Sequence, residues 1–204
     1  MTASVVGGPA HAEPSPAAWD AFVEANHRGS YLQLSAWGRV KAVNGWTARR
    51  LLDAGTGVGA QVLVRRPGPL PWAFAYAPRG PVLERWDAAS VSGLTELARA
   101  GLRDGVRVSH LRIDPEIELG AGPDDGGALT AALRAAGWLP APAIQPVSTR
   151  VIDLRADEAA LWADLRKKWR QYVNKARAGG VVVGDAGPER LDEFYRIYRE
   201  TADR

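Results

Sequence analysis

Short apolar segments of two kinds alternate along most of this chain, and this alternation constrains its fold more than any other feature. Brief runs rich in Val, Leu and aromatic residues are typical of strands, whereas apolar residues at every third or fourth position are typical of helices. One expected helix begins at Ser15-Pro16, and three others cover about 33–43, 88–101 and 128–136. The expected strands cover 46–52, 60–66, 72–76, 106–113 and 147–154. This order predicts an α/β or mixed α+β fold.

Residues 53–59, Asp-Ala-Gly-Thr-Gly-Val-Gly, have the glycine content of a phosphate-binding loop. They lack the spacing of the dinucleotide fingerprint and the lysine of a P-loop, and they join two strands rather than a strand to a helix. We therefore expect a hairpin turn here. Residues 120–127 are expected to form a flexible loop.

The 204 residues suffice for one large domain followed by part of another. We expect a flexible leader at 1–14, a first domain at 15–150 and the beginning of a second domain at 151–204. The last segment is expected to hold one long helix, a short strand and a helix from about Pro188, too few elements to bury a core alone. The chain ends inside that last helix without a capping signal, which we interpret as truncation.

Composition excludes several kinds of site. The chain contains no cysteine, so disulfides, cysteine nucleophiles and thiolate metal sites are excluded. His11, His27 and His110 have no ligand-like spacing, so no metal is expected. There is no signal peptide and no apolar run long enough to span a membrane, from which we expect a cytoplasmic protein.

Residues 158–178 are predicted to form one amphipathic helix with an unusually basic surface. Its apolar stripe is Leu161, Leu165, Trp169, Tyr172 and Ala176, and a row of arginines, Arg166, Arg170 and Arg177, lies beside it. Gly179 and Gly180 should end the helix, and 181–183 should begin a strand. The six Lys and Arg residues between 166 and 177, with no acid among them, suit an anionic partner: nucleic acid, a nucleotide sugar or an anionic membrane surface.

Several short motifs, in a fixed order, are similar to those of one family. They are 31–41 followed by Gly45-Trp46; 76–82; 111–115; Gly137-Trp138 with 145–149 and 152–154; 168–172 with 175–176 and 180–181; and 194–198 with 200–204. In these motifs the chain resembles the Fem family of peptidoglycan interpeptide-bridge aminoacyltransferases. The resemblance implies a GNAT-like acyltransferase domain followed by the start of a second one.

The resemblance also implies an activity. A cytoplasmic enzyme of this kind moves an aminoacyl group from aminoacyl-tRNA to the side-chain amine of a UDP-linked or lipid-linked muropeptide precursor. Aminoacyl-tRNA is the acyl donor, and no other cofactor and no metal is expected. A peripheral position at the inner membrane surface would suit the lipid-linked acceptor. The catalytic elements of the second domain are expected beyond Arg204.

The resemblance places Lys41 and Arg170 at the substrate diphosphate and Tyr172 at the substrate site. A planar guanidinium suits the diphosphate, and the stem of Lys41 can lie over the ring of Trp37. Arg166 belongs to the same arginine row. The spacing of Trp169 and Tyr172 is equally that of core residues, and on spacing alone the core is favoured for both.

An acidic segment follows the predicted strand 106–113, at Asp114, Glu116 and Glu118. A carboxylate there could accept a proton from an attacking amine, but the resemblance assigns it no role, and we interpret the segment as a turn.

Two other functions remain open. The first is a non-catalytic module that binds nucleic acid or a nucleotide sugar through the basic helix 158–178. Binding through many phosphates weakens steeply with salt, whereas capture of one diphosphate weakens gently. The second is an acyl-CoA N-acetyltransferase of the same fold, which would need a Gln/Arg-x-x-Gly-x-Gly loop that the sequence lacks.

Overall fold

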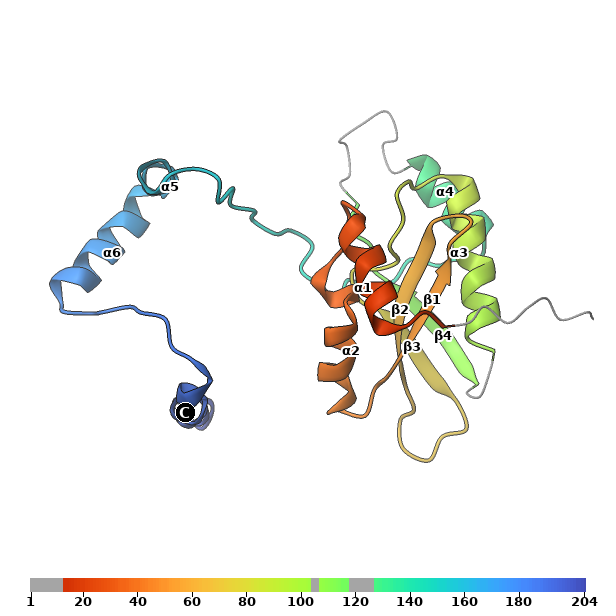
Figure 1. Ribbon diagram of the computed structural model, residues 1–204, viewed down its shortest axis with the longest axis horizontal. Helices are drawn as coiled ribbons and strands as arrows, with labels where there is room; N and C mark the ends of the chain where they lie inside the picture. Colours follow the sequence, from red (N-terminus) through yellow and green to blue (C-terminus); the bar gives the residue numbers. More distant parts are fainter. Residues whose placement is uncertain (1–12, 104–106, 118–126) are drawn as a thin grey trace, which may run out of the picture. The chain divides into compact units, whose positions relative to one another are not determined.

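The computed structural model describes residues 13–103, 107–117 and 127–204 and divides into two compact units, residues 1–148 and 149–204 (Figure 1). Most of the predicted leader and of the predicted loop 120–127 lies outside the described residues. Glu13 and Pro14, the last two leader residues, contact Arg50: its guanidinium lies 2.7 Å from the Glu13 carboxylate, and its Nε donates to the Pro14 carbonyl at 3.1 Å.

A four-stranded mixed sheet forms the centre of the first unit. Its strands are β1 (Thr47–Asp53), β2 (Val58–Arg65), β3 (Ala73–Ala77) and β4 (Val108–Ile113), in the spatial order β1-β2-β3-β4. β1, β2 and β3 pair antiparallel, and β3 and β4 pair parallel. This confirms the mixed α/β class. The glycine-rich segment is the predicted hairpin turn, where the Asp53 carboxylate accepts from the backbone N–H of Gly55 at 3.0 Å.

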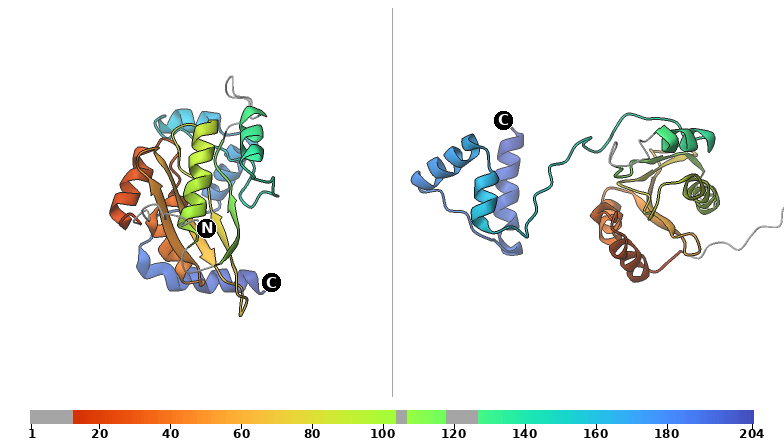
Figure 2. Two further views of the ribbon diagram at one scale, coloured as in Figure 1. Left: turned by 90° about the vertical axis from the view of Figure 1, so that its right-hand side faces the viewer. Right: turned by 90° about the horizontal axis from the view of Figure 1, so that it is seen from above.

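Helices cover both faces of this sheet (Figure 2). α1 (Pro16–Ala25), the short 3-10 helix η1 (Tyr31–Gln33) and α2 (Ser35–Ala42) lie on one face; α3 (Ala88–Gly101) and α4 (Gly127–Ala135) lie on the other. α1 begins as the sequence predicts, with Ser15 accepting from Ala18 and proline in the first turn. α2 approaches closely because Gly38 has no Cβ; one would lie 2.8 Å from the Cβ of Ala48.

The core of the first unit lies between the sheet and these helices. The small alanine side chains of β3 pack with branched side chains of β2 and β4 in one buried cluster. The buried hydrophobic residues include Trp19, Val23, Val58, Val62, Leu63, Ala73, Ala75, Ala77, Leu83, Val91, Leu94 and Leu97.

The second unit contains α5 (Glu158–Asp164), α6 (Lys167–Ala178), the 3-10 helix η2 (Pro188–Arg190) and α7 (Leu191–Ala202). The prediction of one helix over 158–178 was wrong, because Leu165 and Arg166 are extended, with ψ of 134° and 143°. Apolar spacing continues through this break, so it does not reveal it. The carbonyls left open at the end of α5 are satisfied by a side chain of α6.

The two strands predicted at 147–154 and 181–183 are also absent from the described part of the chain. A strand requires a hydrogen-bonded neighbour, and neither segment pairs with one. Val151 and Val182 are 86% and 91% exposed. The predicted helix ends at Gly179 and Gly180 are correct: Gly179 caps α6, and Gly180 has a φ of 77°. The assignment of both units as GNAT-like domains stays a prediction.

Candidate functional site

A polar cluster lies at the carboxyl ends of β3 and β4. The Tyr76 hydroxyl donates to Asp114 Oδ2 at 2.7 Å, and the backbone N–H of Arg79 donates to Asp114 Oδ1 at 2.6 Å. Because β3 and β4 run parallel, their carboxyl ends meet at one edge of the sheet, and that pairing brings Asp114 to the loop after β3. The segment interpreted as a plain turn therefore carries the central carboxylate of the cluster.

A third segment completes the cluster. Gln145 Nε2 donates to the Tyr76 hydroxyl at 3.2 Å, and Arg79 Nη2 donates to the Pro146 carbonyl at 3.1 Å. Arg79 Nε also lies 3.3 Å from the Glu116 carboxylate. Three of the motifs behind the family resemblance, 76–82, 111–115 and 145–149, thus meet at one place.

Tyr76 is held as a proton donor. Partial burial raises its pKa to about 12, and the hydrogen bond to Asp114 and the Asp114 charge act in the same direction, against a lowering by the Gln145 hydrogen bond. The phenol therefore stays protonated near neutral pH. It orients Asp114 Oδ2 without competing for a proton.

The loop after β3 is positioned from the opposite side by Gln33. Its Nε2 donates to the Pro78 carbonyl at 2.8 Å, and its Oε1 accepts from the Gln61 backbone N–H at 2.8 Å. A Cβ on Gly80 would lie 2.6 Å from Gln33 Nε2, so a larger residue there would push the Gln33 amide away from its hydrogen bonds. Arg79 has a φ of 49°, a left-handed conformation that its hydrogen bonds to Asp114 and Pro146 help to hold.

Trp37 and Lys41 lie together on α2. Lys41 Nζ is 5.0 Å from the centroid of the Trp37 ring, and the ring of Tyr31 meets Trp37 edge-on at 6.2 Å. Trp37 Nε1 is buried and has no hydrogen-bond partner within the described residues. α2 packs over Ala48 and Gln61, whose side chains share a sheet face with Tyr76. Lys41, Trp37 and the Asp114 cluster therefore belong to the same side of the first unit.

Arg170 contacts protein rather than solvent alone. Its Nη1 donates to the carbonyls of Leu165 at 2.6 Å and Ala163 at 2.8 Å, and so closes the end of α5. The Arg177 guanidinium lies 5.5 Å from the ring centroid of Trp162, which also joins α6 to α5. Within the described residues, these contacts leave Nε and Nη2 of Arg170 for a ligand. Its role at a diphosphate stays a prediction.

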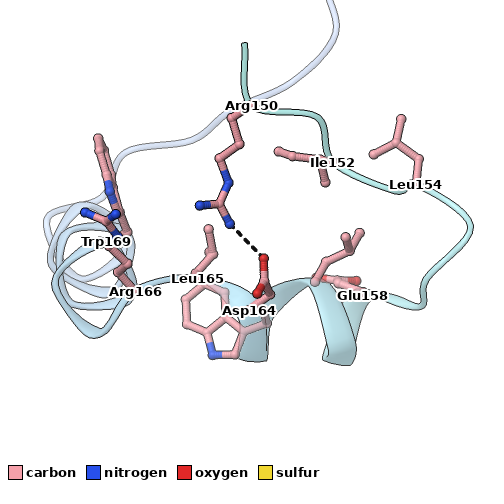
Figure 3. Close-up of a pocket in the computed structure, with 10 residues that line it drawn as sticks. Arg150, Ile152, Leu154, Glu158, Asp164, Leu165, Arg166 and Trp169 are labelled. Atoms are coloured by element: carbon pink, nitrogen blue, oxygen red, sulfur yellow. Dashed lines mark hydrogen bonds and ion pairs between the residues drawn. The ribbon is translucent and has the colours of Figure 1, made fainter. Parts of the chain in front are cut away.

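A cavity of about 610 Å³ lies between α5, the start of α6 and the segment before α5 (Figure 3). Its wall is mostly apolar, and an ion pair of 2.9 Å joins Arg150 to Asp164 beside it. Arg166, the residue before α6, is the one predicted site residue among those lining it: Arg150, Ile152, Leu154, Glu158, Leu161, Trp162, Asp164, Leu165, Arg166 and Trp169.

The aromatic residues of α6 lie at the surface of the second unit. Trp169 and Tyr172 are 59% and 51% exposed and meet edge-on at 6.1 Å, so the core assignment for them was wrong in this structure. Lys168 Nζ lies 5.6 Å from the Tyr172 ring centroid. The role of Tyr172 at the substrate stays a prediction, as does that of Arg166.

Sequence reasoning missed Tyr76, Arg79 and Gln145 as site residues. Asp114 is 38 residues from Tyr76, and Gln145 is 69 residues from it, so no local spacing links them. The available signal was the presence of all three segments among the family-like motifs.

The described residues show neither a metal-binding cluster nor a membrane-spanning helix. No group of three or more His, Cys, Asp and Glu side chains in this part of the chain could hold a metal ion. Among the described helices, none is both long and apolar enough to cross a membrane.

Comparison with known proteins decides the family. The model of the FemAB family matches residues 15–204. This chain belongs to the FemAB family. It is 29% identical over 199 residues to the lipid II:glycine glycyltransferase of Staphylococcus saprophyticus, a match covering 92% of this chain and 46% of that protein. It is 28% identical over 196 residues to the enzyme of the same name from Staphylococcus aureus strain MRSA252, covering 91% and 45%.

A solved structure agrees with this assignment. The crystal structure of FemX superimposes with a TM-score of 0.71 at 25% identity, covering 94% of this chain and 49% of that one. The family resemblance and the mixed α/β fold are thereby confirmed. This FemAB chain spans about half the length of the curated relatives that it matches.

Proposed function

We propose that this FemAB chain acts in aminoacyl transfer from aminoacyl-tRNA to the side-chain amine of a peptidoglycan precursor, with the first unit holding the acceptor. Family membership and relatives named lipid II:glycine glycyltransferase support this proposal. The observation that carries it is that three motif segments meet at Asp114. This cluster lies on the same side of the first unit as α2, which carries Lys41.

The first unit offers two contacts for the acceptor, Lys41 for its diphosphate and Asp114 for its amine. Lys41 lies at the end of α2 where β1 begins, because its carbonyl accepts from the Trp46 N–H at 3.3 Å. Asp114 lies at the other end of the sheet, after β4. The length of α2, about 12 Å for eight residues, sets the scale of their separation. An extended precursor could place its diphosphate at Lys41 and its amine at Asp114.

Asp114 supplies the charge that the acceptor amine needs. Each of its oxygens accepts one hydrogen bond from Tyr76 or Arg79 and keeps a further lone pair. An ammonium bound there can pass its proton to the carboxylate. The free amine then attacks the ester carbonyl carbon, a C–N bond forms, and the C–O bond to the tRNA ribose breaks as the ribose oxygen takes up the second proton that the nitrogen gives up. Tyr76 orients the carboxylate throughout.

The alternative of a non-catalytic module bound to nucleic acid through 158–178 is weakened by the contacts of two arginines. Arg170 closes the end of α5, and Arg177 lies over Trp162, so the arginine row is partly engaged within the protein. An acyl-CoA acetyltransferase remains less favoured, because the sequence lacks the pyrophosphate-binding loop.

Calorimetry tests the proposal by measuring the binding of the UDP-linked and the lipid-linked precursor to the 204-residue chain. We expect binding that Lys41→Ala weakens about tenfold or more, the scale of a lost charge-assisted contact. Arg85→Ala is the matched control, because the Arg85 side chain is 84% exposed and its ion pair with Asp87 is 3.6 Å long. Absence of binding by either precursor, or equal effects of the two variants, would contradict the proposal.

A further inference from the structure

We propose that one end of the first unit docks on an anionic membrane surface. Two loops form this end: residues 43–46, between α2 and β1, and residues 66–72, between β2 and β3. Strand register places them together, because Thr47 at the start of β1 lies opposite Val64 near the end of β2. Figure 1 shows the second loop extending past the ends of its strands. We call this end the docking end.

Exposed apolar side chains lie on both loops. Val43 is 87% exposed, Leu70 37% and Trp72 38%, although the first unit, to which they belong, has a buried core. Trp is the residue type most typical of a membrane interface, where its amphipathic ring sits among headgroups. Prolines at 67, 69 and 71 restrict the second loop, so less conformational entropy is lost when it inserts.

Basic side chains surround these apolar residues. Arg65, Arg66 and Arg107 are exposed, and Lys41 lies at the adjoining end of α2. Arg107 belongs to this end because its carbonyl accepts from the N–H of Ala73, the first residue of β3. Residues 41–50, 63–77 and 107–113 contain no Asp or Glu. Each Lys or Arg near an anionic leaflet adds to the electrostatic attraction, so the docking end combines apolar insertion with positive charge.

Single-stranded RNA is the other polyanion that basic and aromatic residues can bind, and the geometry favours it less. RNA needs free aromatic faces for its bases. At the docking end the Arg65 guanidinium lies 5.7 Å from the Trp46 ring centroid, Trp46 meets Phe74 edge-on at 5.2 Å, and Phe74 stacks on His110 at 6.3 Å. These rings are already engaged with one another, and Leu70 and Val43 offer no face for a base, so of the rings in the two loops only Trp72 is left for stacking.

The docking end also adjoins Lys41. The connection between docking and the acceptor diphosphate at Lys41 rests on the proposed function. A lipid-linked acceptor carries its diphosphate at the membrane surface. Docking through Val43, Leu70 and Trp72 would bring Lys41 to that depth and leave Asp114, at the far end of the sheet, in the aqueous phase with the amine. The docking surface itself is argued from the two loops and is tested without precursor or catalysis, so its failure and that of the proposed function are distinguishable.

A site-specific probe tests the docking end, and the absence of cysteine makes single labelling possible. Leu70→Cys carries an environment-sensitive fluorophore. Leu139→Cys is the matched control, because Leu139 is 86% exposed and follows Trp138, which packs against the buried cluster that includes Val58, at the opposite end of β2. With phosphatidylglycerol/phosphatidylcholine vesicles we expect a blue shift and quenching by lipid-borne quenchers at 70 and neither at 139. Pure phosphatidylcholine should give a much weaker response.

Two substitutions at positions near the label measure how much Trp72 and Arg66 contribute to vesicle binding. In the Leu70→Cys-labelled chain, Trp72→Ala should weaken the probe's vesicle response about fivefold or more, because a large apolar contact is lost. Arg66→Gln should weaken it about fivefold, and Arg85→Gln should not change it. Vesicle binding without any response at 70, as binding through the second unit alone would give, overturns the proposal. So does a response at 70 to a single-stranded RNA oligonucleotide in place of vesicles.

Discussion

The two units of this FemAB chain use apolar residues in opposite ways. In the first unit Trp19, Val62 and Ala75 are fully buried under helices on both sheet faces. In the second unit no described residue is buried, and Phe194, Tyr195 and Tyr198 of α7 are each at least 60% exposed. Amphipathic helices alone do not make a core. The sheet of the first unit supplies the opposing surface, and the described part of the second unit has no sheet.

The same contrast holds for polar contacts. In the first unit Asp114, Tyr76 and Gln145 are brought together over tens of residues of sequence. In the second unit the Arg170 contacts span five to eight residues, and the Arg150–Asp164 ion pair spans 14. A site fixed by long-range contacts depends on the whole unit being folded, whereas the α5–α6 arrangement depends on a few neighbours.

The largest effect is expected from removing a core side chain. Trp19→Ala should lower the free energy of unfolding of the first unit by about 3–5 kcal/mol, because it leaves a cavity and an unpaired Gln33 carbonyl. Phe194→Ala, at a position 64% exposed, should change stability by less than about 0.5 kcal/mol. Urea unfolding followed by fluorescence and circular dichroism measures both. Comparable losses in the two variants would mean that α7 is covered in solution, and the comparison of the units would fail.

An intermediate effect is expected at the α5–α6 junction. Arg170→Ala should free the carbonyls of Ala163 and Leu165 and loosen the end of α5, at a cost of about 1 kcal/mol to the second unit. Amide hydrogen exchange of 158–166 should accelerate, and exchange in β2 should not change. Arg199→Ala, which alters an arginine of α7, is the control. Unchanged exchange in α5 would mean that Arg170 does not close the end of α5 in solution and that its guanidinium faces solvent with the other arginines of the row.

Near neutral pH the smallest effect is expected from Tyr76, because its titration changes stability only in alkaline solution. Its pKa is raised by burial to about 12 from 10, so the folded state favours the protonated phenol. The resulting stabilisation is complete below pH 10 and is lost as pH rises through about 12. Tyr76→Phe should remove that alkaline loss from the first unit, whereas Tyr195→Phe should leave it. Denaturant midpoints between pH 9 and 12 measure this; a loss that persists in Tyr76→Phe would show that another group causes it.

Individual elements show where sequence reasoning was sufficient. The N-cap of α1, the span of α3 at 88–101 and the hairpin at 53–59 agree with prediction, because each depends on residues within a few positions. The break at Leu165 and Arg166 was missed, because a side chain one turn later, Arg170, satisfies the carbonyls there. The strands at 147–154 and 181–183 were predicted from composition, but a strand exists only with a partner.

The candidate site divides in the same way. Trp37 and Lys41 are one helical turn apart, so spacing alone predicted their contact. Asp114 looked like a turn residue because the hydroxyl of Tyr76 and the N–H of Arg79 that engage it come from another strand and loop.

The sequence by itself determined the α-helices of the first unit, the hairpin, the basic character of α6 and, through its motifs, the FemAB family. The tertiary structure decided which residues of the first unit form a site and which apolar residues are buried. The physical reason is that local propensity, capping and turn chemistry act over a few residues, whereas strand pairing and burial require partners that only the folded chain brings into contact.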